Sequence, residues 1–190
     1  MKRFYITTAI DYVNSTPHIG TAYEKIGADV LARFKRLAGY NTFFLMGNDE
    51  HSINVEKKAK SLNLATLDYC DKMENEFRNV WNTLNISYDY FIRTSSKNHV
   101  LSVQEIFRQI STNGDLYKGT YKGWYCVSCE AYIRNDDLVE GKCPTHKLEP
   151  KQLEEENYFF KLTKYKDQLL KHISENPEFI EPSIRKNEII

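Results

Sequence analysis

The stretch from Phe4 to Gly20 limits what this chain can fold into, because an apolar run leads through a polar turn directly into a helical pattern. Pro17 suits the first position of a helix, and Ser15 or Thr16 can cap that helix. The backbone N–H groups at such a helix start are unpaired and electropositive, so they can bind a phosphate. The junction therefore predicts a strand followed by a helix whose N-terminus faces a phosphate-containing ligand.

Two residues at this junction add chemistry to the helix start. His18 supplies a side-chain hydrogen-bond donor, and Gly20 removes a Cβ where an adenine or a ribose can lie flat against the backbone. The pattern Pro-His-x-Gly is short, so a second interpretation stays open. In that interpretation His18 only caps the helix and Gly20 only relieves crowding.

A long amphipathic helix and a second strand follow the junction. The apolar residues that recur at helical spacing are Ile19, Ala22, Tyr23, Ile26, Val30, Phe34 and Leu37. Gly39 is well placed to end the helix. Tyr40 to Met46 is a second apolar run, and polar residues from Asn48 to His51 follow it. Since ligands bind at the carboxyl ends of strands in an open parallel sheet, we expect both polar turns at one edge.

The alternation of helical and strand patterns continues to residue 115. We expect helices over Ser52–Leu62 and over Leu67–Leu84, the second capped by Thr66, then a strand over Tyr88–Ile92 and a helix closed by Asn113-Gly114. This order is typical of the first half of a doubly wound α/β sheet.

Four residues between 126 and 146 have the spacing of a metal site. Cys126-x2-Cys129 and Cys143-x2-His146 read as two knuckles that face each other, each donating two ligands from a tight turn. Three thiolates and one imidazole fill the tetrahedral shell of zinc, so the site is expected to be structural. Two alternatives stay open, namely four unrelated residues and a redox Cys-x2-Cys.

The sequence suggests three parts. Residues 1–115 form the first half of a nucleotide-binding domain, 116–152 a connective insertion, and 153–190 a return toward the first part that is cut short. In this last part Leu153–Glu156 reads as a solvated acidic surface. Asn157–Leu162 reads as a strand, and Thr163 as the cap of a following helix.

Composition narrows the functional class. The chain has 26 basic and 26 acidic residues, so no overall field attracts it to nucleic acid or to a membrane surface. Its charged start lacks the apolar core of a signal peptide, and no apolar run is long enough to span a bilayer. We therefore expect a cytoplasmic, monomeric globular protein whose RNA contacts, if any, are local.

Five segments carry a resemblance to a known family. They are Pro17-His18-Ile19-Gly20, Met46 to His51, Phe91 to Thr94, Tyr125 to Glu130 and Asn157 to Phe160. Together they resemble the methionyl-tRNA synthetases, a family of class I aminoacyl-tRNA synthetases, over nearly the whole chain. The resemblance implies a Rossmann-like, HIGH-type nucleotidyltransferase sheet with a zinc-knuckle insertion. It also implies ATP-dependent activation of L-methionine, with Mg²⁺, and transfer to tRNA(Met).

The resemblance also implies roles for individual residues. His18 and Gly20 are expected to be catalytic, Asn14, His18, Gly20 and Thr21 to hold the nucleotide, Ala9, Ile10 and Tyr12 to surround the methionine side chain, and Asp49 to bind its ammonium group. Tyr12 as an ordinary core residue is the main alternative.

The chain departs from the family at several positions. Thr21 stands where a second histidine is frequent and Ser52 stands where glycine is usual, while Asp11 and Asn48 also differ from commoner versions. The smaller hydroxyl puts the phosphate contact of Thr21 in doubt.

The chain contains no Lys-Met-Ser-Lys-Ser loop, no second half of the nucleotide-binding fold and no helical anticodon-binding domain. We therefore expect an N-terminal fragment that does not charge tRNA alone. Two further hypotheses are a non-catalytic module derived from such an enzyme that binds tRNA or protein, and another class I synthetase or adenylate-forming enzyme.

Overall fold

The computed structural model describes residues 1–190, which divide into two compact units. The first unit comprises residues 1–105 and 126–131, and the second comprises 106–125 and 132–190. None of the helices combines the length and the apolar character that crossing a bilayer requires. The predicted phosphate-binding junction belongs to the first unit, so the fold of that unit decides where its side chains lie.

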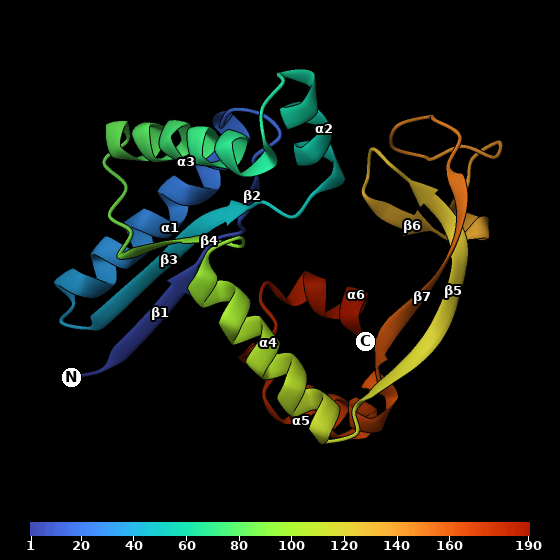
Figure 1. The fold of residues 1–190 in the computed structure, drawn as a ribbon. Coiled ribbons are helices and arrows are strands. Elements are labelled where there is room, and N and C mark those ends of the chain that lie inside the picture. The colour runs from blue at the N-terminus through green and yellow to red at the C-terminus, as the bar shows by residue number, and fades with distance from the viewer. The chain divides into compact units, whose positions relative to one another are not determined.

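The first unit is built on a parallel sheet with β3 (Asn41–Asp49) at its centre. β1 (Arg3–Thr7) pairs with the first half of β3, β2 (Asp11–Tyr12) with its last two residues, and β4 (Tyr90–Arg93) with residues 45–48. All of these pairings are parallel, and Figure 1 shows the strands side by side. The prediction of a parallel α/β sheet is confirmed. Strand β3 extends beyond Met46 because β2 and β4 pair with its last residues.

Gly47 lies in the part of β3 that pairs with β4. It is the register partner of Ile92, and a Cβ at this glycine would lie 2.1 Å from the Ile92 backbone oxygen and 2.5 Å from its Cγ2 atom. Any side chain here would therefore push the two strand backbones apart. The missing Cβ keeps β3 and β4 paired directly before Asn48 and Asp49.

Three helices pack with this sheet, namely α1 (Ile19–Leu37), α2 (Ile53–Ser61) and α3 (Thr66–Thr83), close to their predicted ranges. The largest fully buried apolar side chains of the shared core are Trp81, Phe44, Phe77 and Met46. The predicted Thr66 cap is wrong, because Ala65 occupies the N-cap position of α3 and makes no side-chain hydrogen bond there.

Helix α1 buries a largely polar face. Its buried residues are Lys25, Asp29 and Ala32. Asp29 accepts hydrogen bonds from the Ser87 backbone N–H at 2.7 Å and from Arg33 Nε at 2.7 Å. Of the seven apolar residues that predicted the helix, Ala22 packs partly buried against the core, and the other six are 44–89% exposed, namely Ile19, Tyr23, Ile26, Val30, Phe34 and Leu37. Hydrogen bonds and ion pairs therefore hold this helix on the first unit. From the sequence, its apolar stripe had been expected to do so.

A long antiparallel ribbon forms the β part of the second unit. β5 (Leu116–Cys126) pairs with β7 (Lys151–Phe160), and β6 (Ala131–Ile133) joins the other edge of β5, as Figure 1 shows. The predicted acidic surface Leu153–Glu156 is exposed, but it belongs to β7. The strand starts earlier than predicted because its glutamates face lysines of β5, as in the pair Lys118 Nζ–Glu156 Oε1 at 2.7 Å.

The remaining helices are α4 (Lys97–Thr112), α5 (Lys166–Glu175) and α6 (Lys186–Ile189). Short 3₁₀ helices cover Asn135–Asp137, Leu162–Tyr165, Pro177–Phe179 and Ser183–Arg185. The predicted Thr163 cap is wrong, because one of these 3₁₀ helices precedes α5 and Tyr165 becomes its N-cap.

Asp115 ties the start of β5 to this turn. Although only 3% exposed, its carboxylate accepts hydrogen bonds from Lys164 Nζ at 2.6 Å and from the Tyr165 hydroxyl at 2.6 Å. These hydrogen bonds lower the pKa of Asp115, the one from Lys164 having the largest effect.

Candidate active site and metal centre

The register of β2 on β3 brings two predicted substrate residues together. Asp11 is the partner of Asn48, and Tyr12 is the partner of Asp49. Desolvation, followed by the negative charges of Asp49 and Glu130, raises the pKa of Tyr12 above its usual value. The two residues come from separate segments of the sequence, and a two-residue strand that sequence reasoning missed makes them neighbours.

The Asp49 carboxylate is anchored on one side. Its Oδ1 atom accepts a hydrogen bond from the His51 backbone N–H at 3.1 Å. The His51 ring lies close to β4, with Nε2 at 3.2 Å from the Thr94 carbonyl oxygen. One oxygen of Asp49 is thus tied to the backbone, and the other can accept a charge-assisted hydrogen bond from an ammonium group.

His18 is the N-cap of α1. Its Nδ1 atom accepts a hydrogen bond from the Gly20 backbone N–H at 3.0 Å, and Thr21 Oγ1 accepts one from the His18 N–H at 3.1 Å, which completes a capping box. The predicted caps Ser15 and Thr16 are therefore wrong, and the N–H groups of His18 and Gly20 are paired. Because Nδ1 accepts, the neutral ring carries its proton on Nε2, which is the nitrogen that can donate to a phosphate.

Gly20 makes room for the His18 ring. A Cβ at position 20 would lie 2.9 Å from His18 Cε1 and 3.0 Å from Nδ1. A side chain would therefore push the imidazole out of its capping position. In this structure the open space above Gly20 accommodates the histidine.

A cavity of about 210 Å³ lies beside the β2–α1 junction. Its lining includes three predicted nucleotide residues, Asn14, His18 and Thr21, together with Tyr12. Asp11, Ser15, Thr16, Pro17 and Phe77 complete it. The predicted residues Ala9, Ile10, Gly20 and Asp49 are not part of this lining.

Lys25 and Glu24 were missed by sequence reasoning, although both contact the strand-to-strand loop. Lys25 Nζ donates to the Ala9 carbonyl at 2.8 Å and to Asp11 Oδ1 at 3.1 Å, and the Ala9 N–H donates to Glu24 Oε1 at 2.7 Å. The signal available in the sequence was the acidic residue at position 11, which departs from commoner family versions.

Glu130 connects the first cysteine knuckle to α2. It has a left-handed backbone, with φ at 51°. Its Oε1 atom accepts hydrogen bonds from Ser52 Oγ at 2.5 Å and from the Asn54 backbone N–H at 3.0 Å. A carboxylate at a helix N-terminus interacts favourably with the helix dipole. Glu130 therefore stabilises the start of the helix that follows Asp49.

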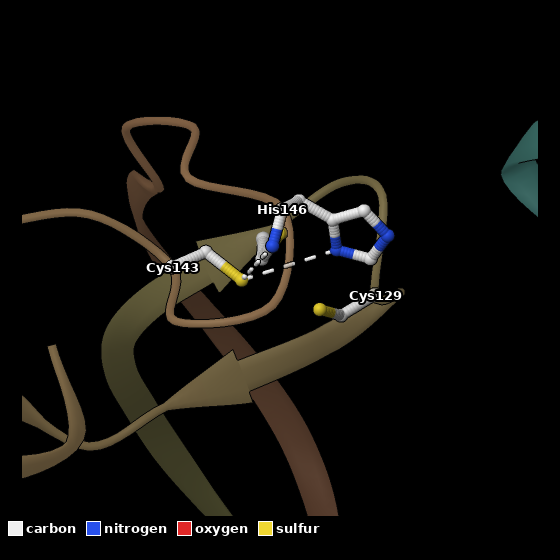
Figure 2. Close-up of side chains that lie close together, drawn as sticks. Cys129, Cys143 and His146 are labelled. Carbon is white, nitrogen blue, oxygen red and sulfur yellow. Dashed lines mark hydrogen bonds between the residues drawn. The ribbon is translucent and has the colours of Figure 1, made fainter. Parts of the chain in front are cut away.

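The four predicted metal ligands converge. The sulfur atoms of Cys126, Cys129 and Cys143 and the ring nitrogen of His146 all lie within 4.8 Å of one another. Figure 2 shows Cys129, Cys143 and His146 gathered around one point, with Cys143 Sγ 3.9 Å from His146 Nδ1. Cys143 Sγ also accepts the His146 backbone N–H at 3.4 Å. Three thiolates and one imidazole at this spacing are compatible with tetrahedral zinc.

Cys70 plays no part in this cluster. It is 1% exposed in the core of the first unit, and burial is the main cause that raises the pKa of its thiol to about 11. The thiol therefore stays protonated at neutral pH and behaves as a small apolar side chain.

Comparisons with known proteins agree on one family. Residues 4–153 match the family described as tRNA synthetases class I (M). The methionine–tRNA ligase of Thermotoga maritima is 49% identical over 192 residues, covering 99% of this chain and 30% of that protein. The enzyme of Clostridium tetani is 46% identical over 189 residues, covering 100% and 30%.

Solved structures extend this agreement to the fold. A Mycobacterium tuberculosis methionyl-tRNA synthetase in complex with methionyl-adenylate is 40% identical, with a TM-score of 0.92, covering 100% of this chain and 38% of that one. The parallel sheet and the Cys/His cluster are those of the N-terminal catalytic portion of a class I aminoacyl-tRNA synthetase. Within this class, the chain belongs to the methionyl-tRNA synthetase family. It spans 30% of the length of the Thermotoga maritima and Clostridium tetani enzymes and 38% of the solved Mycobacterium tuberculosis chain.

Proposed function

We propose that this chain forms the N-terminal part of a methionine–tRNA ligase, which activates L-methionine with ATP and transfers it to tRNA(Met). The observation that carries the proposal is the β2–β3 register, because it sets Tyr12 beside Asp49. Tyr12 also lines the cavity that contains His18. A family relative has been solved with methionyl-adenylate, the product of the first step of this reaction.

In this proposal the amino acid binds at the β2–β3 edge. Asp49 holds the ammonium group through its second carboxylate oxygen, since the first is tied to the His51 N–H. Ala9, Ile10 and Tyr12 surround the side chain, where a flexible thioether gains from apolar and aromatic contact. The half-exposed ring of Tyr12 is suited to this role, because it is not buried in the core and can contact a ligand.

ATP binds at the α1 start. A methionine carboxylate oxygen attacks the α-phosphorus, the bond from that phosphorus to the bridging oxygen breaks, and pyrophosphate leaves. The carboxylate is already ionised, so positioning and charge stabilisation supply the rate. His18 donates from Nε2 to the phosphate while Nδ1 stays in the cap. Asn14 holds the nucleotide, Gly20 contributes by leaving room for the His18 ring, and Thr21 contributes by fixing His18 in the capping box. Mg²⁺ accompanies the triphosphate.

The metal centre has a different role in this proposal. Cys126, Cys129, Cys143 and His146 hold one zinc ion per chain. Four protein ligands complete a tetrahedral shell, so no position is left for substrate or for an activated water. The ion therefore stabilises the fold of the knuckles.

Calorimetric titration with L-methionine, L-leucine and ATP tests the amino-acid site. We expect the chain to bind L-methionine and to bind L-leucine at least about tenfold more weakly, a difference of about 1.4 kcal/mol. Asp49→Asn should weaken methionine binding by a similar factor, because the ammonium loses its charged partner. Equal affinities for the two amino acids, or an unchanged affinity in Asp49→Asn, would contradict the assignment.

Turnover separates the ligase from a non-catalytic module. We expect no tRNA charging by this chain alone, since the Lys-Met-Ser-Lys-Ser loop that normally meets the β- and γ-phosphates is not in its sequence. Methionine-dependent pyrophosphate exchange should appear when a polypeptide with the remaining two thirds of a relative is added. Binding of tRNA with no exchange under these conditions would support the module instead.

A further inference from the structure

Lys25 is a fully buried lysine with three acceptors around its ammonium group. Its side chain is 0% exposed. The Nζ atom donates to the Ala9 carbonyl at 2.8 Å, to Asp11 Oδ1 at 3.1 Å and to Glu24 Oε2 at 3.1 Å. An ammonium has three N–H donors, so each finds a partner. A lysine is rarely buried without such pairing, because removing its charge from water is costly.

One of these acceptors, the Ala9 carbonyl, lies in the loop that joins β1 to β2, and a second belongs to Asp11, the first residue of β2. Lys25 holds the carbonyl of Ala9, while Glu24 Oε1 accepts the N–H of the same residue at 2.7 Å. Both backbone groups of Ala9 are therefore bound by neighbouring residues of α1. The contact from Lys25 to Asp11 fixes the residue directly before Tyr12.

The position of Asp11 gives this arrangement a second consequence. Asp11 lines the cavity beside His18, and its Oδ2 atom lies 3.1 Å from Lys25 Nζ. A carboxylate facing a cavity that accepts a triphosphate would repel it, and the lysine charge offsets this repulsion. The same ammonium thus orders the loop and neutralises its acidic residue.

We propose that Lys25 is a positioning residue, which holds the backbone of residues 9–12 in the geometry that the amino-acid pocket requires. The consequence for methionine rests on the proposed function, whereas the order of the loop does not. The simpler alternative is that Lys25 is only a counter-ion for Asp11. In that case a double variant, which lacks both charges, should recover the amide exchange, the stability and the ligand affinities that the lysine variant loses.

The test compares Lys25→Met, the double variant Asp11→Asn/Lys25→Met and the control Lys60→Met. Methionine keeps the length of the lysine stem and removes the ammonium. Lys60 is an exposed helical lysine on α2 that pairs with Glu56, so its variant reports loss of a charge away from the loop. Each protein is measured by amide exchange of the segment 4–13 and by titration with L-methionine and ATP.

We expect both Lys25 variants to exchange the 8–12 amides about tenfold faster or more, and to bind L-methionine about tenfold more weakly. The double variant should recover the thermal stability of the parent and bind ATP within about twofold of it, because the buried Asp11 carboxylate is gone and the Glu24 carboxylate, which is 44% exposed, keeps the Ala9 N–H. Lys60→Met should match the parent in all measurements.

Two results would overturn the proposal. One is exchange of the 8–12 amides within about twofold of the parent in the double variant, and the other is full recovery of its methionine affinity. If the parent chain itself binds no methionine, the amino-acid site proposed for this chain fails, and the exchange data still decide whether Lys25 orders the loop.

Discussion

The β1–α1 junction and the Cys/His knuckles both gather polar side chains from short loops, but they are held in different ways. At the junction, side chains of the protein fix the backbone. Lys25 donates a hydrogen bond to the Ala9 carbonyl, and His18 caps α1. In the knuckles, the ligand atoms lie within 4.8 Å of one another, where three thiolates would repel without a cation. The junction is therefore organised by folding itself, whereas the knuckles are expected to fold together with their ion.

Metal removal should separate the two regions most clearly. In Cys143→Ser, or after chelation, we expect zinc to be lost and amide exchange of residues 126–146 to rise by roughly 100-fold or more, since structural zinc supplies much of the folding free energy of such knuckles. The peptide 4–21 should change by less than about twofold. Exchange with mass detection and zinc analysis measure both.

Cys70→Ser is the matched control, because this cysteine lies in the core of the first unit. It should keep one zinc per chain while lowering the stability of that unit. Zinc loss in Cys70→Ser, or unchanged amide exchange of residues 126–146 in Cys143→Ser, would contradict the view that only the knuckles depend on a metal ion.

A second prediction concerns the backbone after β2. The hydroxyl of Tyr69, itself 2% exposed, donates to the carbonyl of fully buried Val13 at 2.8 Å. Tyr69→Phe leaves this carbonyl unsatisfied, so we expect a loss of about 1–2 kcal/mol in the free energy of unfolding. Denaturant unfolding measures it. Tyr23→Phe, at an 82% exposed tyrosine, should change stability by less than about 0.5 kcal/mol. Equal losses in both variants would mean that the hydrogen bond does not fix the junction.

A smaller effect is expected at Glu130, which follows Cys129 of the Cys/His cluster but caps α2 in the first unit. Glu130→Ala removes an acceptor from the helix start, so we expect a loss of about 1 kcal/mol in unfolding free energy. Ser52 still accepts the Asn54 N–H in this variant, which limits the loss. If Glu130→Ala keeps its zinc but is less stable, Glu130 acts only as the cap of α2. If it loses zinc, Glu130 also supports the metal site.

The smallest effects concern pH and have opposite signs in the two units. Burial is the main cause that raises the pKa of Asp11, against the lowering by Lys25, whereas hydrogen bonds from Lys164 and Tyr165 lower the pKa of Asp115. A lowered folded pKa gives stability that is present above the unfolded value of about 3.9 and is lost as pH falls through the folded pKa. A raised folded pKa has the reverse effect, so stability falls as pH rises between the two values.

Thermal unfolding of Asp115→Asn and Asp11→Asn between pH 3 and pH 6 tests these signs. As pH falls, the stability of the parent should decrease relative to that of Asp115→Asn and increase relative to that of Asp11→Asn. Parallel pH profiles for the two variants would show that burial does not dominate at Asp11.

Much of the site could be predicted because its signals are local. The Cys-x2-Cys and Cys-x2-His spacings predicted the convergence of four ligands, since each knuckle is a single tight turn. The helix after Pro17 followed from its periodicity. The preferred caps Ser15 and Thr16 were wrong, whereas the alternative interpretation, in which His18 caps the helix and Gly20 relieves crowding, describes the local geometry.

Other features could not be predicted because their partners are distant in sequence. The buried face of α1 carries Lys25 and Asp29, which are tolerated because a loop before the helix and Ser87 far after it provide their partners. Periodicity alone places charged residues in water and apolar residues inside, the reverse of what α1 shows. Likewise β2 is a strand only because β3 extends beside it, so no local pattern marks the contact between Tyr12 and Asp49.

Gly47 has a consequence for how mutational data on this protein should be interpreted. In a saturation library selected for methionine binding, every substitution at this position should be rejected as strongly as at Asp49, although Gly47 has no functional group. The cause is steric, because any Cβ would lie 2.1 Å from the Ile92 backbone oxygen. Intolerance to substitution at Gly47 therefore reflects the spacing of β3 and β4. It could be mistaken for a role in substrate binding only because Gly47 lies close to Asp49.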